Sequence, residues 1–170
     1  MVLQTERLVL RRWLPGDEIS VAPIYAKPEV MRCIPGGTWD AERTARIVAR
    51  MRELDEEQGY GFYPLALKDG GTLIGHAGLG HLEGGSEVEV AYVLDEPYWG
   101  RGLATEAARA ILAHGLGVLG LPRIVAVAFP ENPRSIAVMV RCGMRSCGLA
   151  RHFGREVVKY ETAPTGSAAR

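Results

Sequence analysis

Ten residues in the middle of the chain could bind a phosphate through their backbone. They run from Tyr98 to Ala107 (YWGRGLATEA), after an alternating apolar run that predicts a strand and before an amphipathic run that predicts a helix. A glycine loop at the start of a helix directs several N–H groups and the positive end of the helix dipole at one position, where a phosphate can sit. Gly100, Gly102 and Ala104 leave the backbone open to a ligand. The alternative is an ordinary tight turn before a helix, for which glycines are common.

Two common nucleotide-binding patterns do not match this loop. A dinucleotide-binding fingerprint would have a third small residue at Thr105 and an acidic residue about twenty positions later, and no such acid is evident. A P-loop would continue with Lys and then Ser or Thr, and this loop does not. The pattern therefore indicates a phosphate site of another kind.

The composition predicts one globular domain. Of 170 residues, 47% are hydrophobic and 24% are charged, so a domain over residues 1–162 can bury a sizeable core, and we expect the tail 163–170 to be disordered. The formal net charge is zero, which argues against nucleic-acid binding. Six acids and no Lys or Arg lie between Asp69 and Gly100, whereas nine basic residues and three acids lie between Arg101 and Lys159. One flank suits a cationic ligand and the other an anionic one, unless both are solvated faces.

Cysteine usage and hydropathy favour a cytoplasmic protein without a metal. Cys33, Cys142 and Cys147 are odd in number and form no close metal-type pair, so neither a disulfide framework nor a zinc site is expected. No apolar stretch approaches the roughly 18 residues of a membrane span. The N-terminal run carries charges within its apolar residues and does not read as a signal peptide.

Apolar periodicity predicts seven strands and four helices. Alternating or short apolar runs place strands at 6–13, 62–68, 72–78, 86–94, 124–129, 145–151 and 155–161. Apolar stripes with capping residues or glycine stops place helices at 17–26, 41–58, 103–119 and 133–142. A strand and helices, then a meander, then alternating helix and strand predict a three-layer mixed α/β sandwich.

In this order the chain resembles the GNAT-superfamily N-acetyltransferases, and more narrowly the ribosomal-protein N-terminal acetyltransferases among them. The resemblance covers about Leu3 to Glu161. It rests on the segments Thr5–Arg11, Leu73–Leu79, Glu89–Leu94, Tyr98–Ala107, Leu121–Ile124, Asn132–Ser135 and Arg141–Met144. Each segment is weak alone, but their shared order is hard to obtain by chance. The resemblance implies the GNAT fold, acetyl-CoA as the acetyl donor, an amine acceptor and no metal.

The resemblance assigns the glycine loop to the pyrophosphate of coenzyme A. The loop residues that it assigns to the coenzyme are Gly100, Arg101, Gly102, Leu103, Ala104 and Thr105. It assigns backbone N–H groups to the reaction's oxyanion from Tyr92, Val93 and Leu94, and the pantetheine arm to Asn132 and Ser135. Among four arginines we expect Arg101 to meet the phosphates because it lies in the loop; the others are Arg109, Arg134 and Arg141. Trp99 replaces the Gln or Arg of the wider superfamily, with little expected effect on a cradle built from backbone.

The resemblance also predicts two catalytic residues. Glu89 is the expected general base, directly or through a water, since carboxylates do this work when burial raises their pKa. Glu87, two residues earlier, is the reserve, and an ion-paired or solvent-facing Glu89 is the alternative. Ser135 is the expected acid or hydrogen-bond donor to the coenzyme sulfur, although an ordinary first-turn serine fits the pattern equally well. Met139 stands where many members have a tyrosine that is thought to protonate the leaving thiolate.

The acceptor is left open by the sequence. The closer resemblance favours a protein or peptide N-terminal amine, whose pKa of about 7.7–8.0 needs only a modest base, unlike lysine at about 10.4. The alternatives are a small-molecule amine (an antibiotic, polyamine or amino acid) and a non-catalytic acyl-CoA-binding module, which Met139 alone supports. Trp39, Tyr60 and Phe62 are candidates for the acceptor groove. We interpret His76 and His81 as structural or surface histidines rather than acceptor-side bases, and a homodimer stays open.

Overall fold

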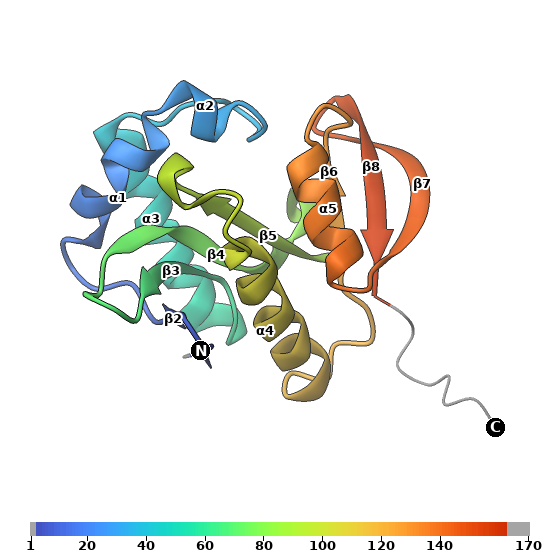
Figure 1. The fold of residues 1–170 in the computed structure, drawn as a ribbon, viewed down its shortest axis with the longest axis horizontal. Helices are drawn as coiled ribbons and strands as arrows, with labels where there is room; N and C mark the ends of the chain where they lie inside the picture. The colour runs from blue at the N-terminus through green and yellow to red at the C-terminus, as the bar shows by residue number, and fades with distance from the viewer. Residues whose placement is uncertain (1–2, 163–170) are drawn as a thin grey trace.

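The alternating apolar runs form the strands of one mixed sheet, with helices on both of its faces (Figure 1). The structure is a computed structural model that describes residues 3–162. Its eight strands lie in the order β1-β2-β3-β4-β5-β6-β8-β7. The three-layer mixed α/β sandwich predicted from the sequence is confirmed, whereas the predicted disordered tail 163–170 lies outside the described residues.

The element bounds agree closely with the predicted ranges. The strands are β1 (Leu3–Gln4), β2 (Leu8–Leu10), β3 (Phe62–Leu67), β4 (Leu73–His81), β5 (Val88–Leu94), β6 (Val125–Ala128), β7 (Arg145–His152) and β8 (Arg155–Glu161). The helices are α1 (Asp17–Tyr25), α2 (Pro28–Met31), α3 (Ala41–Gln58), α4 (Leu103–Gly117) and α5 (Pro133–Arg141). Two short 3₁₀ turns, Leu82–Gly84 and Glu96–Tyr98, flank β5. No helix in this part of the chain is both long enough and apolar enough to cross a membrane.

Two elements go beyond the predicted seven strands and four helices. The first is β1, whose two residues fold back to pair with Leu10 and Val9 of β2. The second is α2, which begins at Pro28, a residue that from sequence alone reads only as a chain break. Proline suits the first position of a helix because its missing N–H would have no partner there and its φ angle is already helical.

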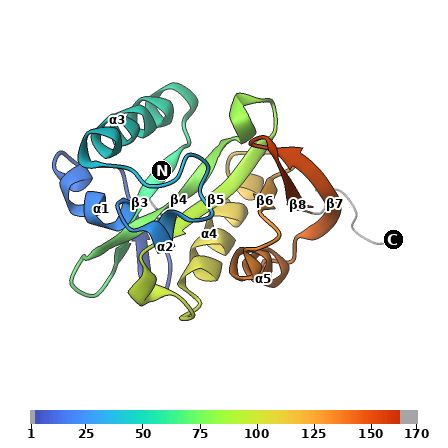
Figure 2. The same ribbon diagram turned by 90° about the horizontal axis from the view of Figure 1, so that it is seen from above.

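The helices divide between the two faces of the sheet. Figure 2 shows α3 on one side and α4 and α5 on the other. Buried residues of α1 and α3 pack with Val93 of β5, whereas those of α4 and α5 pack with Val90 and Leu94. Since side chains alternate along a strand, Glu89 and Ala91 share the α1/α3 face with Val93, and Tyr92 lies on the α4/α5 face.

The sheet opens between β5 and β6. These two strands are parallel, and within residues 3–162 they are paired only at Glu89 and Val125, while all the other neighbouring strands are antiparallel. Beyond Glu89, the edge of β5 that faces β6 has no strand partner. Backbone N–H and C=O groups along this edge are therefore available to a ligand.

Candidate active site

A cleft of about 1600 Å³ lies where β5 and β6 separate. It is lined by β5, by the glycine loop, by the start of α5 and by the segment between α2 and α3. All of the predicted site residues except Arg101 line it: Glu89, Tyr92, Val93, Leu94, Gly100, Gly102, Leu103, Ala104, Thr105, Asn132 and Ser135. Residues from distant parts of the chain therefore meet in one cleft.

The glycine loop presents unpaired backbone donors to this cleft. Gly100 and Gly102 have φ angles of 71° and 78°, a conformation that favours glycine. Gly102 precedes α4, and no side chain caps the helix. The first bond of this helix is from the Glu106 N–H to the Gly102 carbonyl, so the N–H groups from Leu103 to Thr105 precede the helical ladder. Such a helix start binds anions.

Trp99 fastens the glycine loop to β5. Its indole Nε1–H donates to the Leu94 carbonyl at 2.7 Å, and the Arg134 guanidinium lies 4.6 Å from the centroid of its ring. Trp99 thus ties together the loop, β5 and the start of α5. The sequence did not predict this structural role of Trp99; it showed only that Trp99 replaces the Gln or Arg of the wider superfamily.

Arg101 does not line the cleft, although the sequence favours it as the phosphate contact. Its guanidinium lies 5.6 Å from the centroid of the Tyr98 ring, and its carbonyl accepts a hydrogen bond from Arg7 at 2.9 Å. The other three arginines singled out from the sequence, Arg109, Arg134 and Arg141, do line the cleft. The reason is local, because the left-handed glycines on either side of Arg101 set where its side chain points.

Glu89 lies in the cleft without a hydrogen-bond or ion-pair partner among the described residues. Burial raises the pKa of Glu89 to about 7, and the nearby charge of Glu83 acts in the same direction. A carboxylate with a pKa near the working pH can take a proton and release it again, as a general base must. The arrangement suits proton transfer and does not suit an ion-pair role.

Glu87, the reserve base, is engaged elsewhere. It pairs with Lys159 and with Arg123, and the hydrogen bond from Lys159 helps to hold the pKa of Glu87 below its ordinary value. Glu87 does not line the cleft. Of the six acids between Asp69 and Gly100, Glu89 and Glu96 line the cleft and the other four do not; among those four, Glu83 pairs with His152 and Asp95 with Lys27.

Tyr92 and Ser135 meet across the cleft. The Tyr92 hydroxyl lies 3.0 Å from Ser135 Oγ, and the Ser135 N–H donates to Asn132 Oδ1 at 3.2 Å, which caps α5. Burial raises the pKa of Tyr92 to about 12, while its hydrogen bond with Ser135 acts in the opposite direction. Two hydroxyls therefore stand beside each other, and the sequence pointed only to the backbone of Tyr92. Met139 is buried on the same helix.

A family comparison agrees with this geometry. Residues 7–145 match the model of the family described as "Acetyltransferase (GNAT) domain". The chain belongs to the GNAT acetyltransferase family. The unpaired edge of β5 and the open start of α4 are thus features of a GNAT acetyltransferase.

Several relatives of this GNAT acetyltransferase match it over most of their length. The uncharacterized N-acetyltransferase YnaD of Bacillus subtilis (strain 168) is 33% identical over 148 residues, which cover 87% of this chain and 85% of YnaD. A crystal structure of an acetyltransferase from Agrobacterium tumefaciens str. C58 is 30% identical with a TM-score of 0.84, covering 96% of this chain and 94% of that one. The ribosomal-protein-S5-alanine acetyltransferase from Vibrio fischeri is 17% identical with a TM-score of 0.81, covering 98% of both chains. This last likeness shows the fold alone.

The GNAT acetyltransferase has an aromatic wall on the α1/α3 side of its cleft. Trp39, Phe62 and His76 line the cleft, and the rings of Trp39 and His76 stack with centroids 6.1 Å apart. Burial lowers the pKa of His76 to about 4, so the ring is uncharged at neutral pH and a poor base. Tyr60 and His81, by contrast, contact each other and do not line the cleft.

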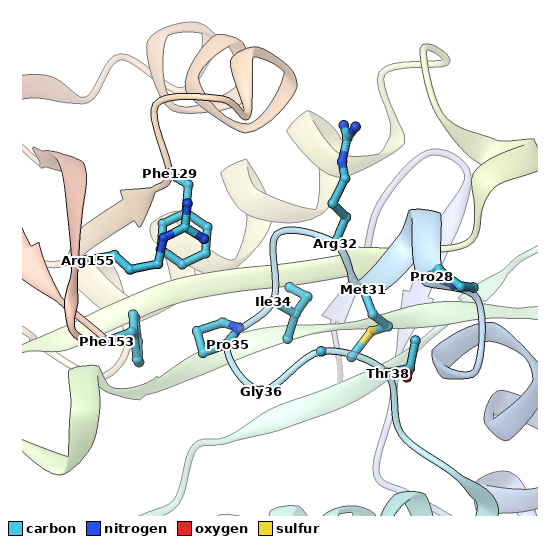
Figure 3. Close-up of a pocket in the computed structure, with 11 residues that line it drawn as sticks. Pro28, Met31, Arg32, Ile34, Pro35, Gly36, Thr38, Phe129, Phe153 and Arg155 are labelled. Atoms are coloured by element: carbon cyan, nitrogen blue, oxygen red, sulfur yellow. The ribbon is translucent and has the colours of Figure 1, made fainter.

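A smaller pocket of about 440 Å³ adjoins the cleft and shares several of its lining residues (Figure 3). One wall is the segment after α2, with Ile34 and Pro35. The opposite wall is Phe129 and Phe153, with the Arg155 guanidinium 4.0 Å from the centroid of the Phe129 ring. The cleft therefore continues into a mostly apolar opening. Within residues 3–162, no group of three or more His, Cys, Asp or Glu side chains is placed to hold a metal ion.

Proposed function

We propose that the protein transfers an acetyl group from acetyl-CoA to a primary amine by direct attack in a ternary complex, and that the amine is the N-terminal α-amine of a protein or peptide. The observation that carries this proposal is the half-buried, unpartnered Glu89 in the cleft, whose pKa is raised to about 7. An α-amine has a pKa of about 7.7–8.0, which such a base can match, whereas a lysine side chain at about 10.4 needs more help.

The residues around the cleft fit acetyl-CoA. The side-chain oxygen of Thr105 is buried beside the α4 N-terminus and has no hydrogen-bond partner, and a Cβ at Gly100 would meet no atom within 4 Å. The N–H groups from Leu103 to Thr105 would hold the pyrophosphate, with Arg109 and Arg134 nearby. The unpaired edge of β5 and the Asn132–Ser135 turn would hold the pantetheine arm. When bound, acetyl-CoA supplies an acetyl group activated as a thioester.

The side chains on the two faces of β5 divide the proton transfers between them. Glu89, on the α1/α3 face, takes a proton from the attacking amine, directly or through a water. N–H groups on the free edge of β5 stabilise the negative charge that develops on the acyl oxygen. Ser135, held next to Tyr92 on the α4/α5 face, donates a hydrogen bond or a proton toward the leaving sulfur. A thiol with an ordinary pKa of about 8.5 needs only modest help to leave.

Removing either hydroxyl of the Tyr92–Ser135 pair should slow the reaction moderately. We expect Ser135→Ala and Tyr92→Phe each to lower kcat about 3- to 30-fold, and the double variant to lose less than the product of the two, because the hydroxyls act as a unit. Steady-state kinetics of the four proteins would measure this. Purely additive losses, or KM effects without a change in kcat, would contradict the pairing.

Two other functions are weaker. Glu89 could equally serve as the base for a small-molecule amine. The cleft volume of about 1600 Å³ does not distinguish a small-molecule acceptor from a peptide. A non-catalytic acyl-CoA-binding module would not need a carboxylate held at a pKa of about 7. A cytoplasmic location and a homodimer stay predictions.

An acceptor screen tests the proposed function. Labelled acetyl-CoA would be offered with two pools, one of peptides with free α-amines and one of aminoglycosides, polyamines and amino acids, and mass spectrometry would locate the label. We expect label on peptide N-termini. Label confined to the small amines would overturn the choice of acceptor while leaving acetyl transfer intact.

A further inference from the structure

The aromatic wall contains two polar groups that the proposed chemistry does not use. His76 is 5% exposed and Trp39 is 7% exposed, and both line the cleft. The Trp39 Nε1–H is buried with no hydrogen-bond partner. Buried donors are nearly always paired, so an unpaired one in a cleft points to a ligand atom.

The hydrogen bond between Tyr25 and His76 determines which nitrogen of His76 faces a ligand. The Tyr25 hydroxyl lies 2.6 Å from His76 Nδ1, and burial raises the pKa of Tyr25, so the phenol keeps its proton. The phenol has no other acceptor among the described residues and therefore donates to Nδ1. The neutral imidazole then carries its own proton on Nε2, where it has no partner in residues 3–162.

The backbone register places His76 on the face of the sheet that carries Glu89. His76 lies directly opposite Val93 in the β4–β5 ladder, on the same face as Glu89. Between them the ladder has Gly78, Gly80 and Ala91 on this face, and the Phe62 ring lies over Gly80. Glu89 lies opposite Gly80, four residues from His76, so the two side chains are separated by roughly 13 Å along the strand. This span is longer than one amine and its adjacent carbonyl can bridge with two direct hydrogen bonds, so Glu89 would reach the amine through a water.

The residues of the aromatic wall disfavour an acceptor that carries a second cationic group. The rings that contact His76 are Tyr25, Trp39 and Phe62, which favour an apolar or aromatic body. Two unpaired N–H donors require an acceptor oxygen, and an ammonium group offers none. The face of the Trp39 ring already has the Arg43 guanidinium 5.9 Å away.

We propose that His76 is a specificity-determining residue: its Nε2–H donates to a carbonyl oxygen of the acceptor, whose apolar or aromatic side chain packs against Trp39 and Phe62. The acceptor class is an α-amino acyl group, in which an amine, the adjacent carbonyl and an apolar side chain occur together. This inference rests on the proposed acetyl transfer to an α-amine. Polyamines and aminoglycosides lack the carbonyl and carry further cationic groups.

The test compares two acceptors that differ by one carboxamide group, phenylalaninamide, which carries it, and phenethylamine, which does not. His76→Asn keeps an amide near the position of Nδ1 but does not reach the position of Nε2, whereas His76→Gln places an amide nitrogen near Nε2. We expect His76→Asn to raise KM for phenylalaninamide about 5- to 30-fold, an effect of about 1–2 kcal/mol, with kcat and the KM for acetyl-CoA unchanged. Phenethylamine should show no such loss, and His76→Gln should restore most of the affinity. Circular dichroism would establish that both variants fold.

Each other outcome has a defined meaning. Equal losses for both acceptors, or no loss for either, would overturn the role of His76 and leave the proposed function standing. Peptides that begin with Phe or Leu should be better acceptors than matched peptides that begin with Lys or Asp, and the opposite order would overturn the apolar subsite. Comparing phenylalaninamide with the longer peptides would show whether the preferred acceptor is a free amino acid derivative or the end of a longer chain. Acetylation of spermidine alone would overturn both the inference and the proposed function.

Discussion

Replacing Glu89 by Gln should lower kcat/KM for the amine acceptor by about 10²- to 10⁴-fold, the range that general-base catalysis contributes. Glutamine has nearly the same shape but cannot take the proton of the amine. Acetyl-CoA should bind this variant with unchanged affinity, because we propose that the glycine loop and the free edge of β5 hold the coenzyme. Isothermal titration with acetyl-CoA and steady-state kinetics with the acceptor would separate the two effects.

The raised pKa of Glu89 also predicts how activity and stability change with pH. Since burial raises the pKa of Glu89 to about 7 and the acceptor amine has a pKa of about 7.7–8.0, kcat/KM of the wild type should fall with two protonation steps as the pH drops. Glu89→Gln should keep only the step that belongs to the amine. The raised pKa means that the folded protein favours neutral Glu89, so ionisation opposes folding as the pH rises above about 4.5 toward 7. The variant should therefore be at least as stable as the wild type at pH 8.

Glu87→Gln is the matched control, with activity expected within about twofold because Glu87 lies outside the cleft. A larger loss of activity in Glu87→Gln than in Glu89→Gln would mean that Glu87, and not Glu89, is the base.

Gly75→Ala should destabilise the fold by about 2–6 kcal/mol, a large part of the 5–15 kcal/mol typical of a whole domain. A Cβ at Gly75 would lie 1.9 Å from the Val93 carbonyl oxygen, and the φ angle of 143° is unfavourable for any other residue. Relief of this clash must move Val93, which lines the cleft. We expect urea unfolding to show the loss of stability and kinetics to show reduced activity in the fraction that folds.

Gly71→Ala is the control that separates backbone strain from the clash. Gly71 has a φ angle of 68°, but a Cβ there would meet nothing within 4 Å. Its substitution should cost about 1–2 kcal/mol from the left-handed conformation alone and leave activity unchanged. Equal losses of stability at Gly71 and Gly75 would contradict the close contact with Val93.

Local sequence patterns predicted the parts of the site that depend on short-range structure. The glycine loop and the start of α4 are specified within ten residues, and Asn132 caps α5 through the N–H of Ser135, three positions later. The strand before that loop was predicted by alternation, but the choice of Glu89 on it came from the family resemblance. Physical rules for caps, turns and alternation act over these distances, so the sequence alone could place these residues.

Contacts between distant segments could not be predicted in this way. Tyr92 and Ser135 are 43 positions apart, and their contact depends on how β5 and α5 pack on opposite sides of the opening. Tyr25 and His76 are 51 positions apart, so the burial of His76 follows from the packing of α1 on β4. The side chain of Arg101 depends on the torsions of its neighbouring glycines, for which no sequence rule gives a direction.

A pair of peptides tests whether the acceptor is an α-amine activated by Glu89. One peptide carries a free α-amine and a dimethylated lysine; the other has the same sequence with a blocked α-amine and a free lysine. Both would be incubated with labelled acetyl-CoA and either the wild type or Glu89→Gln, and tandem mass spectrometry would locate the label. We predict label on the α-amine of the first peptide, with none on the second and little with the variant. Label on the lysine side chain would rule out an α-amine acceptor, and equal labelling by the Glu89→Gln variant would rule out Glu89 as the base.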